Sequence, residues 1–408
     1  MINKNLRKAY SELFGDENLI LIDYTRRRQV SPSDLRRIEE ENVEKIIFID
    51  HKPTPVNFLK ALFKNGDEKP DPKEYIIHVF GDYPLYLTEW RTVNELLLGK
   101  KVKYVCASWK QKKYLEKYIS QTEMVYVSPF PVDSKQFNYN PEKREVLRQE
   151  LGIDLQDKVM IYTGRLSYQK RISELIDLFL SSIRDGKIEN NNKLLIIGKY
   201  DLLGLQYLSY TQIYGEYFRN VDKVLAKYPG LEDHVIFEGE IENTKLNDYY
   251  NLADYYVSLS TYHDEDYGMS VAESFCSGLP ALLTNWAGYF SFQLEEKKEF
   301  CPLIPVSLGQ YKPTIDMKVA ESKMIEILNL KYNREEVSSL YQNNFSVPAC
   351  AKILENIIYS ESHLYEGPTE LMIQLTNEQF LKGNEIFRLE TNREFNSFYF
   401  KAYDVYAE

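Results

Sequence analysis

The 408-residue sequence lacks the features that mark several large classes of protein. It has no run of about 18 apolar residues, so it predicts no transmembrane helix. The N-terminal residues, Met-Ile-Asn-Lys-Asn, are not followed by an apolar segment, so we expect no signal peptide. No repeat of solenoid length and no low-complexity segment occurs. The sequence therefore predicts a folded globular protein that does not span a membrane.

Cysteine is scarce, and negative charge prevails. Four cysteines lie far apart and have neither metal-ligand nor disulfide spacing: Cys106, Cys276, Cys301 and Cys350. We expect them to be buried thiols in a reducing compartment, which predicts a cytoplasmic protein. The net charge of −11 argues against nucleic acid as a partner.

A pair of carboxylates flanks the start of a predicted helix. Residues 269–277 form a helical pattern that Gly278 ends. The first amides of this helix have no intrahelical acceptor and are suited to phosphate oxygens; they belong to Gly268, Met269 and Ser270. Glu265 and Glu273 can each accept hydrogen bonds from a diol. The alternative is that both glutamates are solvated acids favoured by the helix dipole.

A strand, turn and helix elsewhere in the sequence carries two cations. Residues 159–164 are apolar and end in glycine, and a helical pattern begins at Ile172. Arg165 and Lys170 lie between them, at the carboxyl end of the strand, where ligands bind in open α/β sheets. Together they could neutralise a diphosphate without a metal. The alternative is a turn with solvated cations.

These two elements together resemble a known family. The matching positions are Gly164-Arg165, Gln169-Lys170, Glu265 to Glu273 and Gly278-Leu279-Pro280. They are similar to the nucleotide-sugar half of a retaining family-4 glycosyltransferase of the GT-B fold, and the similarity covers about residues 140–360. The resemblance implies transfer of a sugar from a UDP- or GDP-linked donor to a glycan, lipid-linked or protein acceptor, in polysaccharide or glycoconjugate biosynthesis.

The resemblance also implies a role for each residue. Arg165 and Lys170 would hold the donor diphosphate. Glu273 would hold the nucleoside ribose, and Glu265 would contact the transferred sugar. The other donor contacts that it implies are backbone amides of Gly268, Met269 and Ser270, and base contacts by Glu240 and Ile241.

The resemblance implies that the anomeric configuration is retained without an enzymic nucleophile. The leaving phosphate oxygen would take the proton of the acceptor. We expect no metal and no cofactor besides the nucleotide-sugar co-substrate. Residues 264–266, Asp-Glu-Asp, imitate the Asp-x-Asp metal motif of the other glycosyltransferase fold. We discount that motif because it lies inside the Glu265 to Glu273 element.

Apolar segments alternate with helical patterns through both halves of the sequence. Strands are expected at 19–23, 45–50, 75–82, 102–106, 124–127, 159–164, 193–198, 234–239, 255–260 and 279–283. They predict an α/β protein of two doubly wound Rossmann-like domains, which in the GT-B fold face each other across a cleft. We assign 1–150 to an acceptor-binding domain, 151–365 to a nucleotide-sugar-binding domain and 366–408 to a C-terminal extension.

His78 and Asp82 are the chemical candidates of the N-terminal half. They lie four residues apart at a predicted strand end. His78 resembles the family histidine that touches the donor sugar and its leaving group, which makes it a catalytic candidate with Glu265, Arg165 and Lys170. Asp82 could orient the acceptor hydroxyl. The alternative is that the histidine is only packed in the core.

Two departures from the family pattern lie in this half. The usual glycine-rich loop after the first strand is absent, since residues 23–28 are Asp-Tyr-Thr-Arg-Arg-Arg. Where relatives commonly carry Pro-Asn-Gly-Val-Asp, residues 129–133 are Pro-Phe-Pro-Val-Asp. Both differences predict a divergent acceptor half.

Residues 91–118 reverse the acidic character of the chain. They hold eight cations against Glu95 and Glu116, with Trp109 interleaved: Arg91, Lys100, Lys101, Lys103, Lys110, Lys112, Lys113 and Lys117. Such a segment could dock on anionic lipid at the inner face of the membrane. The alternative is a solvated helical face.

The extension and the activity leave further alternatives open. Phe387 with Leu389, and Phe398 with Phe400, alternate at strand spacing, so residues 366–408 would pack back on the N-terminal half or pair with a partner strand. Other functions would be a nucleotide-sugar epimerase or a non-catalytic GT-B subunit. The residues that fit a donor argue against the last of these.

Overall fold

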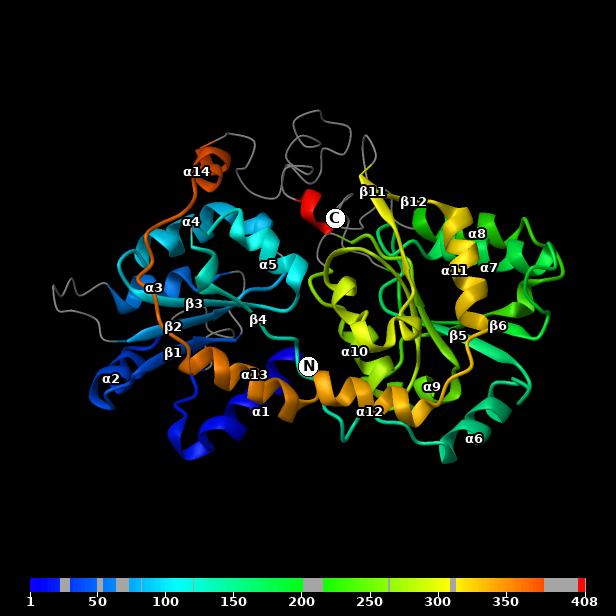
Figure 1. Ribbon diagram of the computed structural model, residues 1–408, viewed down its shortest axis with the longest axis horizontal. Helices are drawn as coiled ribbons and strands as arrows, with labels where there is room; N and C mark the ends of the chain where they lie inside the picture. The colour runs from blue at the N-terminus through cyan, green and yellow to red at the C-terminus, as the bar shows by residue number, and fades with distance from the viewer. Residues whose placement is uncertain are drawn as a thin grey trace. The chain divides into compact units, whose positions relative to one another are not determined.

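The chain forms two compact units (Figure 1). The computed structural model describes residues 1–22, 30–49, 54–63, 73–81, 83–119, 121–200, 216–262, 265–308, 313–377 and 403–407. Unit 1 comprises Met1–Pro131 and Cys350–Ile386, and unit 2 comprises Val132–Ala349 and Phe387–Glu408. The chain thus passes between the units at 131/132 and 349/350, whereas we drew boundaries from the sequence at 150 and 365.

Unit 1 is built on a four-stranded parallel sheet of order β1-β2-β3-β4. Its strands are β1 (Lys45–Phe48), β2 (Glu74–His78), β3 (Lys101–Cys106) and β4 (Val125–Val127). Every residue of β2 is buried, as expected for a parallel strand covered on both faces. Four predicted strands are confirmed. The prediction of a strand at 19–23 is wrong for residues 19–22, which the structure describes and which pair with no described strand.

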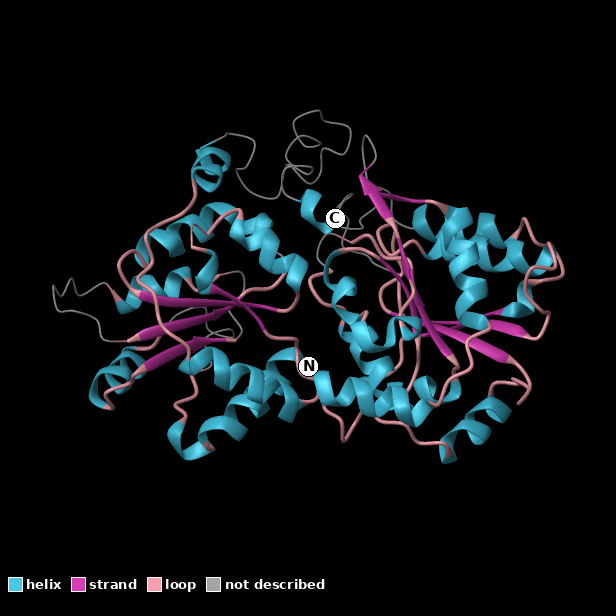
Figure 2. Ribbon diagram, viewed as in Figure 1, coloured by secondary structure: helices cyan, strands magenta, loops and turns pink. Residues whose placement is uncertain are grey.

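Helices cover both faces of this sheet (Figures 1 and 2). They are α1 (Ile2–Phe14), α2 (Pro32–Glu40), α3 (Val56–Leu62), α4 (Leu87–Leu96), α5 (Trp109–Glu116), α13 (Val347–Tyr359) and α14 (Glu370–Asn377). Ser31 and Ser108 begin α2 and α5 by accepting hydrogen bonds from first-turn amides. Helix α14 belongs to the C-terminal extension that the sequence predicted. It packs on α4, where Arg91 Nη1 donates to Asn377 Oδ1 at 2.7 Å.

Unit 2 is built on a six-stranded parallel sheet of order β10-β9-β8-β5-β6-β7. Its strands are β5 (Lys158–Thr163), β6 (Asn192–Ile197), β7 (Val235–Gly239), β8 (Tyr255–Ser258), β9 (Ala281–Thr284) and β10 (Leu303–Ile304). An antiparallel pair, β11 (Val306–Leu308) and β12 (Pro313–Ile315), lies outside the sheet. The chain runs from β5 outward to β7 and then returns to the other side of β5 as β8. The order therefore reverses between β5 and β8.

The helices of unit 2 also lie on both faces of its sheet (Figure 2). They are α6 (Glu142–Glu150), α7 (Ile172–Arg184), α8 (Glu216–Leu225), α9 (Leu246–Leu252), α10 (Met269–Cys276), α11 (Met317–Leu328) and α12 (Arg334–Phe345). The apolar positions Ile172, Leu175, Ile176 and Phe179, predicted to form one helix face, are fully buried against β5 and β6. Burying a side chain of this size contributes about 1.5–3 kcal/mol, so this face fixes α7 on the sheet.

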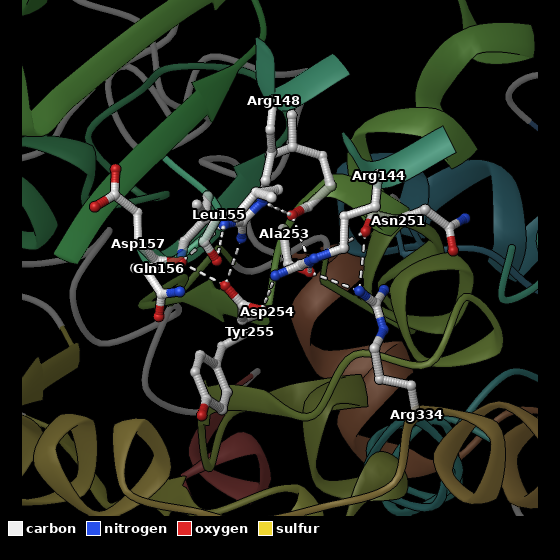
Figure 3. Close-up of polar contacts among 12 residues, drawn as sticks. Arg144, Arg148, Leu155, Gln156, Asp157, Asn251, Ala253, Asp254, Tyr255 and Arg334 are labelled. Atoms are coloured by element: carbon white, nitrogen blue, oxygen red, sulfur yellow. Dashed lines mark hydrogen bonds and ion pairs between the residues drawn. The ribbon is translucent and has the colours of Figure 1, made fainter. Parts of the chain in front are cut away.

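An arginine cluster, made of Arg144, Arg148 and Arg334, holds the carboxyl end of α9 (Figure 3). The three guanidinium groups donate to the last carbonyls of the helix, with Arg148 Nε at 3.0 Å from Leu252 O. Arg144 and Arg148 also share Asp254, at 2.6 and 2.8 Å. Burial lowers the pKa of Arg148, which is fully enclosed. Cations at this helix end satisfy its unpaired carbonyls and oppose its dipole.

The predicted burial of all four cysteines is confirmed. Burial raises the pKa of the Cys301 and Cys350 thiols, so these side chains behave as small apolar groups. Among the residues that the structure describes, no helix is long and apolar enough to cross a bilayer. The alternating segments at 387–389 and 398–400 lie outside the described residues, while Tyr406 packs edge-on against Trp286 of unit 2 at 5.7 Å.

Candidate active site

The strand order of unit 2 brings the two predicted motifs together. Arg165 and Lys170 follow β5, and Glu265 follows β8, which is the direct neighbour of β5. The order of the sheet reverses at this pair of strands. Ligands of open α/β sheets bind at such a switch point, outside the carboxyl ends of the strands. The motifs, about a hundred residues apart, therefore meet where the fold is suited to hold a ligand.

The loops after β5 and β8 are bonded to each other. Thr261 N donates to Gln169 O at 2.9 Å, and Arg171 Nε donates to Thr261 Oγ1 at 2.9 Å. Arg171 has φ 55°, a left-handed conformation that costs a non-glycine residue about 1–2 kcal/mol. The side-chain hydrogen bonds of Arg171 offset this strain and hold the residue in place at the start of α7. The two loops thus hold their charged side chains on a common support.

Lys170 and Glu265 contact each other directly. The Lys170 ammonium donates to Glu265 Oε2, and Ser260 Oγ donates to the same oxygen at 2.7 Å. Glu265 is buried, so this pairing gives its carboxylate the counter-charge that a buried anion requires. The two residues to which we assigned different parts of the donor are therefore neighbours in one ion pair.

The ring of Tyr262 lies beside both cations of the site. Its centroid is 5.3 Å from the Arg165 guanidinium carbon and 4.9 Å from Lys170 Nζ. Both distances are within the range of cation–π attraction. The Tyr262 backbone is fixed in turn, because Trp286 Nε1 donates to its carbonyl at 2.8 Å. The ring therefore holds two positive charges close together before any anion binds.

Helix α10 begins beside this group at Gly268. Its φ of 104° lies in the left-handed region, and a β-carbon at this position would lie 2.6 Å from Cε1 of Tyr289. Only glycine fits here. The first-turn amides of Met269 and Ser270 have no intrahelical acceptor, as predicted from the sequence. The Ser270 hydroxyl shares a hydrogen bond of 2.9 Å with the hydroxyl of Tyr256.

Glu273 lies one turn into α10 and is only 2% exposed. Burial raises the pKa of its carboxyl group from 4.5 to about 8. The Tyr250 hydroxyl lies 3.5 Å from Oε2 and also bonds Thr163 Oγ1 at 2.9 Å. Oε1 has no hydrogen-bond partner among the described residues. A buried carboxylate with an unsatisfied oxygen is costly, and hydroxyl donors from a ligand would relieve that cost.

Glu240 and Ile241 follow β7, two strands away from β5. Glu240 is an exposed residue, and both its oxygens accept from Lys199 Nζ, at 2.8 and 2.9 Å. A solvent-exposed pair of this kind contributes at most about 1 kcal/mol. Ile241 is half-buried. The assignment of these two residues to the base stays a prediction.

His78 ends β2 in unit 1 and is buried. Its Nε2 shares a hydrogen bond of 2.7 Å with the hydroxyl of Tyr10 on α1, and the two rings pack edge-on at 5.8 Å. Burial raises the pKa of Tyr10, so the phenol keeps its proton. Asp82 lies outside the described residues, as do residues 23–28. The catalytic role of His78 stays a prediction.

Many cations of residues 91–118 have intramolecular partners. Arg91 pairs with Glu95, Lys112 with Glu116, and the buried Lys103 with Glu74. Lys100 lies 5.1 Å from the centroid of the Phe63 ring. Lys101 and Lys113 are exposed. The positive charge that the sequence shows in this segment is thus partly neutralised within unit 1.

The structure unites most of the predicted donor residues and adds several that the sequence did not reveal. The additions are Ser260, Tyr262, Tyr250 and Thr163. Thr163 directly precedes Gly164 of the first motif, and Tyr262 precedes Glu265 by three residues, so closeness to the motifs was their only signal. Nothing in the local pattern of α9 distinguishes Tyr250 from Tyr249. Only the fold places Tyr250 beside Glu273.

Comparison with known proteins agrees with this geometry. Residues 143–301 match the sequence family described as Glycosyl transferases group 1. The alpha-monoglucosyldiacylglycerol synthase of Streptococcus pneumoniae is 29% identical over 141 residues, which are 35% of this chain and 27% of that protein. The mannosylfructose-phosphate synthase of Agrobacterium fabrum is 30% identical over 158 residues, 39% of this chain and 32% of that protein. The matched part thus spans about a third of each relative.

Solved structures extend the likeness to most of the chain. Anabaena Alr3699/HepE, in complex with UDP and glucose, has a TM-score of 0.57 at 16% identity and covers 81% of this chain and 82% of that one. At this identity the likeness shows the fold alone. The fold is α/β and of the GT-B class with Rossmann-like domains, and the residues that match glycosyl transferases group 1 lie within unit 2. This confirms the fold class that the sequence predicted.

Proposed function

We propose that this chain is a retaining, family-4 type glycosyltransferase that takes its sugar from a nucleoside diphosphate sugar. The observation that carries the proposal is the meeting of Arg165, Lys170 and Glu265 with the start of α10 at the switch point of unit 2. The group 1 match over residues 143–301 includes all of these residues. The neighbouring fold of Anabaena Alr3699/HepE is described with UDP and glucose, which supports UDP as the first donor nucleotide to test.

Each part of the donor has a counterpart among the described residues. Arg165 and Lys170 are the cations for the diphosphate, supported by the amides at the start of α10. Glu273 supplies an unpaired carboxylate oxygen for the ribose hydroxyls. Glu265 is then available to the transferred sugar once the diphosphate takes Lys170 from it. The acceptor is a glycan, a lipid-linked molecule or a protein.

The reaction breaks the bond between the anomeric carbon and the diphosphate oxygen and forms a bond to the acceptor oxygen on the same face. The acceptor proton passes to the leaving diphosphate oxygen. Negative charge grows on that oxygen as its bond breaks. Arg165 and Lys170, already positioned by Tyr262, stabilise this charge with little rearrangement. In this proposal no side chain forms a covalent bond with the sugar.

Calorimetric titration of the purified chain with UDP, GDP and ADP tests the donor site. One nucleoside diphosphate should bind, and the Lys170→Ala variant should bind it much more weakly. An exposed lysine of the same unit, Lys227, provides the control: Lys227→Ala should leave the affinity within a factor of two of wild type. Failure of all three nucleotides and of their sugars to bind would remove the basis of the proposal.

Product analysis separates transfer from the other activities that the sequence left open. With the donor sugar and no acceptor, an epimerase would yield an altered nucleotide sugar, whereas a transferase yields at most slow hydrolysis. We expect turnover to persist in EDTA, because the two cations and the helix amides replace a metal in neutralising the diphosphate. Loss of turnover in EDTA and its recovery with manganese would contradict the metal-free reaction.

A further inference from the structure

Trp109 differs from the other two tryptophans of the chain. Trp90 is buried and stacks on Tyr83 at 4.8 Å, and Trp286 is buried and donates a hydrogen bond to Tyr262. Trp109 is 59% exposed. Its side chain makes no hydrogen bond and no ring contact to any residue that the structure describes. Its large aromatic surface is thus available to a ligand, whereas the surfaces of Trp90 and Trp286 are used inside the fold.

Local structure fixes the position of Trp109 firmly. It is the first residue of α5, and the Ser108 side chain accepts a hydrogen bond from the Gln111 amide to begin the helix. The Gln111 side chain then joins two strand ends: its Nε2 donates to Val79 O at 3.2 Å, and its Oε1 accepts from Ala107 N at 2.8 Å. The exposed indole therefore stands on a rigid base and not on a loose loop.

This base lies at the carboxyl edge of the unit 1 sheet. An aromatic residue follows each of three adjacent strands there: Phe80 after β2, Trp109 after β3 and Phe130 after β4. Phe80 and Phe130 stack at 5.4 Å. His78 ends β2 at the same edge. In a parallel α/β sheet this edge is where ligands bind.

A membrane is the other occupant that an exposed tryptophan in a lysine-rich segment suggests. Two other apolar side chains of unit 1, Leu98 and Leu364, are also well exposed. Both lie at the opposite edge of the sheet, where β3 begins. Leu98 precedes β3, and Leu364 pairs with Lys101, the first residue of β3. Six residues of strand separate the edges by roughly 17–20 Å. Trp109 therefore does not belong to one continuous apolar patch with them.

We propose that Trp109 stacks on a sugar ring of the acceptor, so that the acceptor is a glycan or glycoside. This inference rests on the proposed function and narrows its acceptor class. A pyranose ring presents a flat face of C–H groups rimmed by hydroxyls. An indole matches both features, because it offers a flat apolar face and an N–H donor at its edge. A bare lipid tail or a protein hydroxyl would use only one of them.

The intrinsic fluorescence of the full chain tests the proposal. Trp90 and Trp286 are buried, so acrylamide quenching reports mainly on Trp109. The probes are the methyl α- and β-glycosides of glucose, galactose, mannose and N-acetylglucosamine, each titrated with UDP present. At least one should change the emission in a saturable way and protect it from acrylamide. The Trp109→Phe variant is titrated in parallel. If the emission change arises at Trp109, this variant should not show it.

Kinetics with the glycoside that binds supply the second measurement. Trp109→Ala should raise the KM for that acceptor about tenfold or more, because it removes both the flat apolar face and the N–H donor of the indole. UDP affinity and acceptor-free donor hydrolysis should not change. Leu98→Ala, an exposed apolar residue of the opposite edge, should leave the acceptor KM at the wild-type value.

The outcomes distinguish this inference from the function beneath it. A chain that binds UDP but whose Trp109 responds to no glycoside up to the solubility limit would overturn the inference alone. A blue shift of Trp109 emission with phosphatidylglycerol vesicles, without any glycoside response, would also overturn it and indicate a membrane contact. A chain that binds no nucleotide would instead refute the proposed function.

Discussion

The carboxyl edges of the two parallel sheets carry opposite kinds of side chain. In unit 2 the edge holds a buried ion pair, Lys170 with Glu265, and a buried carboxyl group, Glu273. In unit 1 the corresponding edge holds a hydrogen-bonded histidine-tyrosine pair, His78 with Tyr10, and an exposed indole, Trp109. The backbone architecture is shared, so the chemistry of each edge depends on a few residues after each strand.

This difference in side chains determines which ligands each edge can recognise. Buried charges cannot adapt without leaving a counter-charge unpaired, so the edge of unit 2 suits one constant ligand such as a diphosphate. An exposed aromatic face is tolerant, because many sugar rings present a similar apolar surface. We therefore expect substitutions in unit 2 to act on the donor and on the rate, and substitutions in unit 1 to act on the choice of acceptor. Five predictions test the unit 2 side, in order of decreasing effect.

Replacing Lys170 by alanine should have the largest effect. The variant removes a diphosphate cation and leaves the buried Glu265 without its partner. We expect kcat to fall by about a hundredfold to a thousandfold, the range for losing one preorganised electrostatic group. Donor hydrolysis or transfer rates measure it. Lys227→Ala, in an exposed pair with Asp177, should stay within twofold, and an equal loss in both variants would refute the distinction between the buried and the exposed pair.

Gly198→Ala should unfold unit 2 more readily. A β-carbon at this position would lie 1.8 Å from the carbonyl oxygen of Gly164, and φ is 146°. We expect the free energy of unfolding to fall by about 3 kcal/mol or more, from overlap and backbone strain together. Gly230→Ala is the matched control, since its φ is 84° but open space surrounds it. Urea unfolding curves should show a loss of only about 1 kcal/mol there.

The affinity for UDP should rise with pH up to about 8, the pKa of Glu273. Ribose hydroxyls donate best to the ionised carboxylate, which is the minor form below that pH. If only this form binds, affinity falls about tenfold for each pH unit below the pKa. Calorimetric titrations between pH 6 and 9, in roughly unit steps, measure the slope. Glu273→Gln should give a flat profile, and a wild-type profile that is equally flat would exclude Glu273 from the ribose site.

The same raised pKa acts on stability with a definite sign. Between 4.5 and about 8 the folded state retains the proton of Glu273 that the unfolded state releases. The contribution of this group to the free energy of unfolding therefore decreases as the pH rises through that window. Glu273→Gln removes the dependence, so the difference between variant and wild type should grow toward pH 8.

Tyr250→Phe should have the smallest effect of the five. It removes the hydroxyl that bonds Thr163 and lies near Glu273 Oε2. We expect a loss of about 1 kcal/mol in the free energy of unfolding. The midpoint of the UDP-affinity profile should move to higher pH, because the Tyr250 hydrogen bond lowers the pKa of Glu273. Tyr249→Phe, whose hydroxyl bonds the peripheral Glu238, should leave that midpoint unchanged.

Local sequence patterns predicted β5 to β9 of unit 2 and the apolar face of α7, but they did not predict β10, β11 and β12. These patterns succeed because a buried parallel strand is a continuous apolar run and a covering helix repeats every three to four residues. Residues 19–22 carry an equally apolar run yet form no strand, since a strand also requires a neighbour with which to pair. The apolar pattern alone does not encode that neighbour.

The candidate site was predictable as a set of charges but not as a set of contacts. Arg165, Lys170, Glu265 and Glu273 were visible from their spacing. The direct bond between Lys170 and Glu265 depends on β8 lying beside β5, which is a property of the strand order. The raised pKa of Glu273 depends on its burial, beside Tyr250 of α9, which one helix turn of sequence does not reveal.

The bond between the loops after β5 and β8 has a consequence for the order of folding. Its two residues, Gln169 and Thr261, are separated in the chain by β6 and β7, which lie on the other side of β5 from β8. Contacts between such distant segments close large loops and form late. During synthesis, Arg165 and Lys170 leave the ribosome long before Glu265. The nascent chain therefore carries a positively charged, unpaired edge until the second motif arrives.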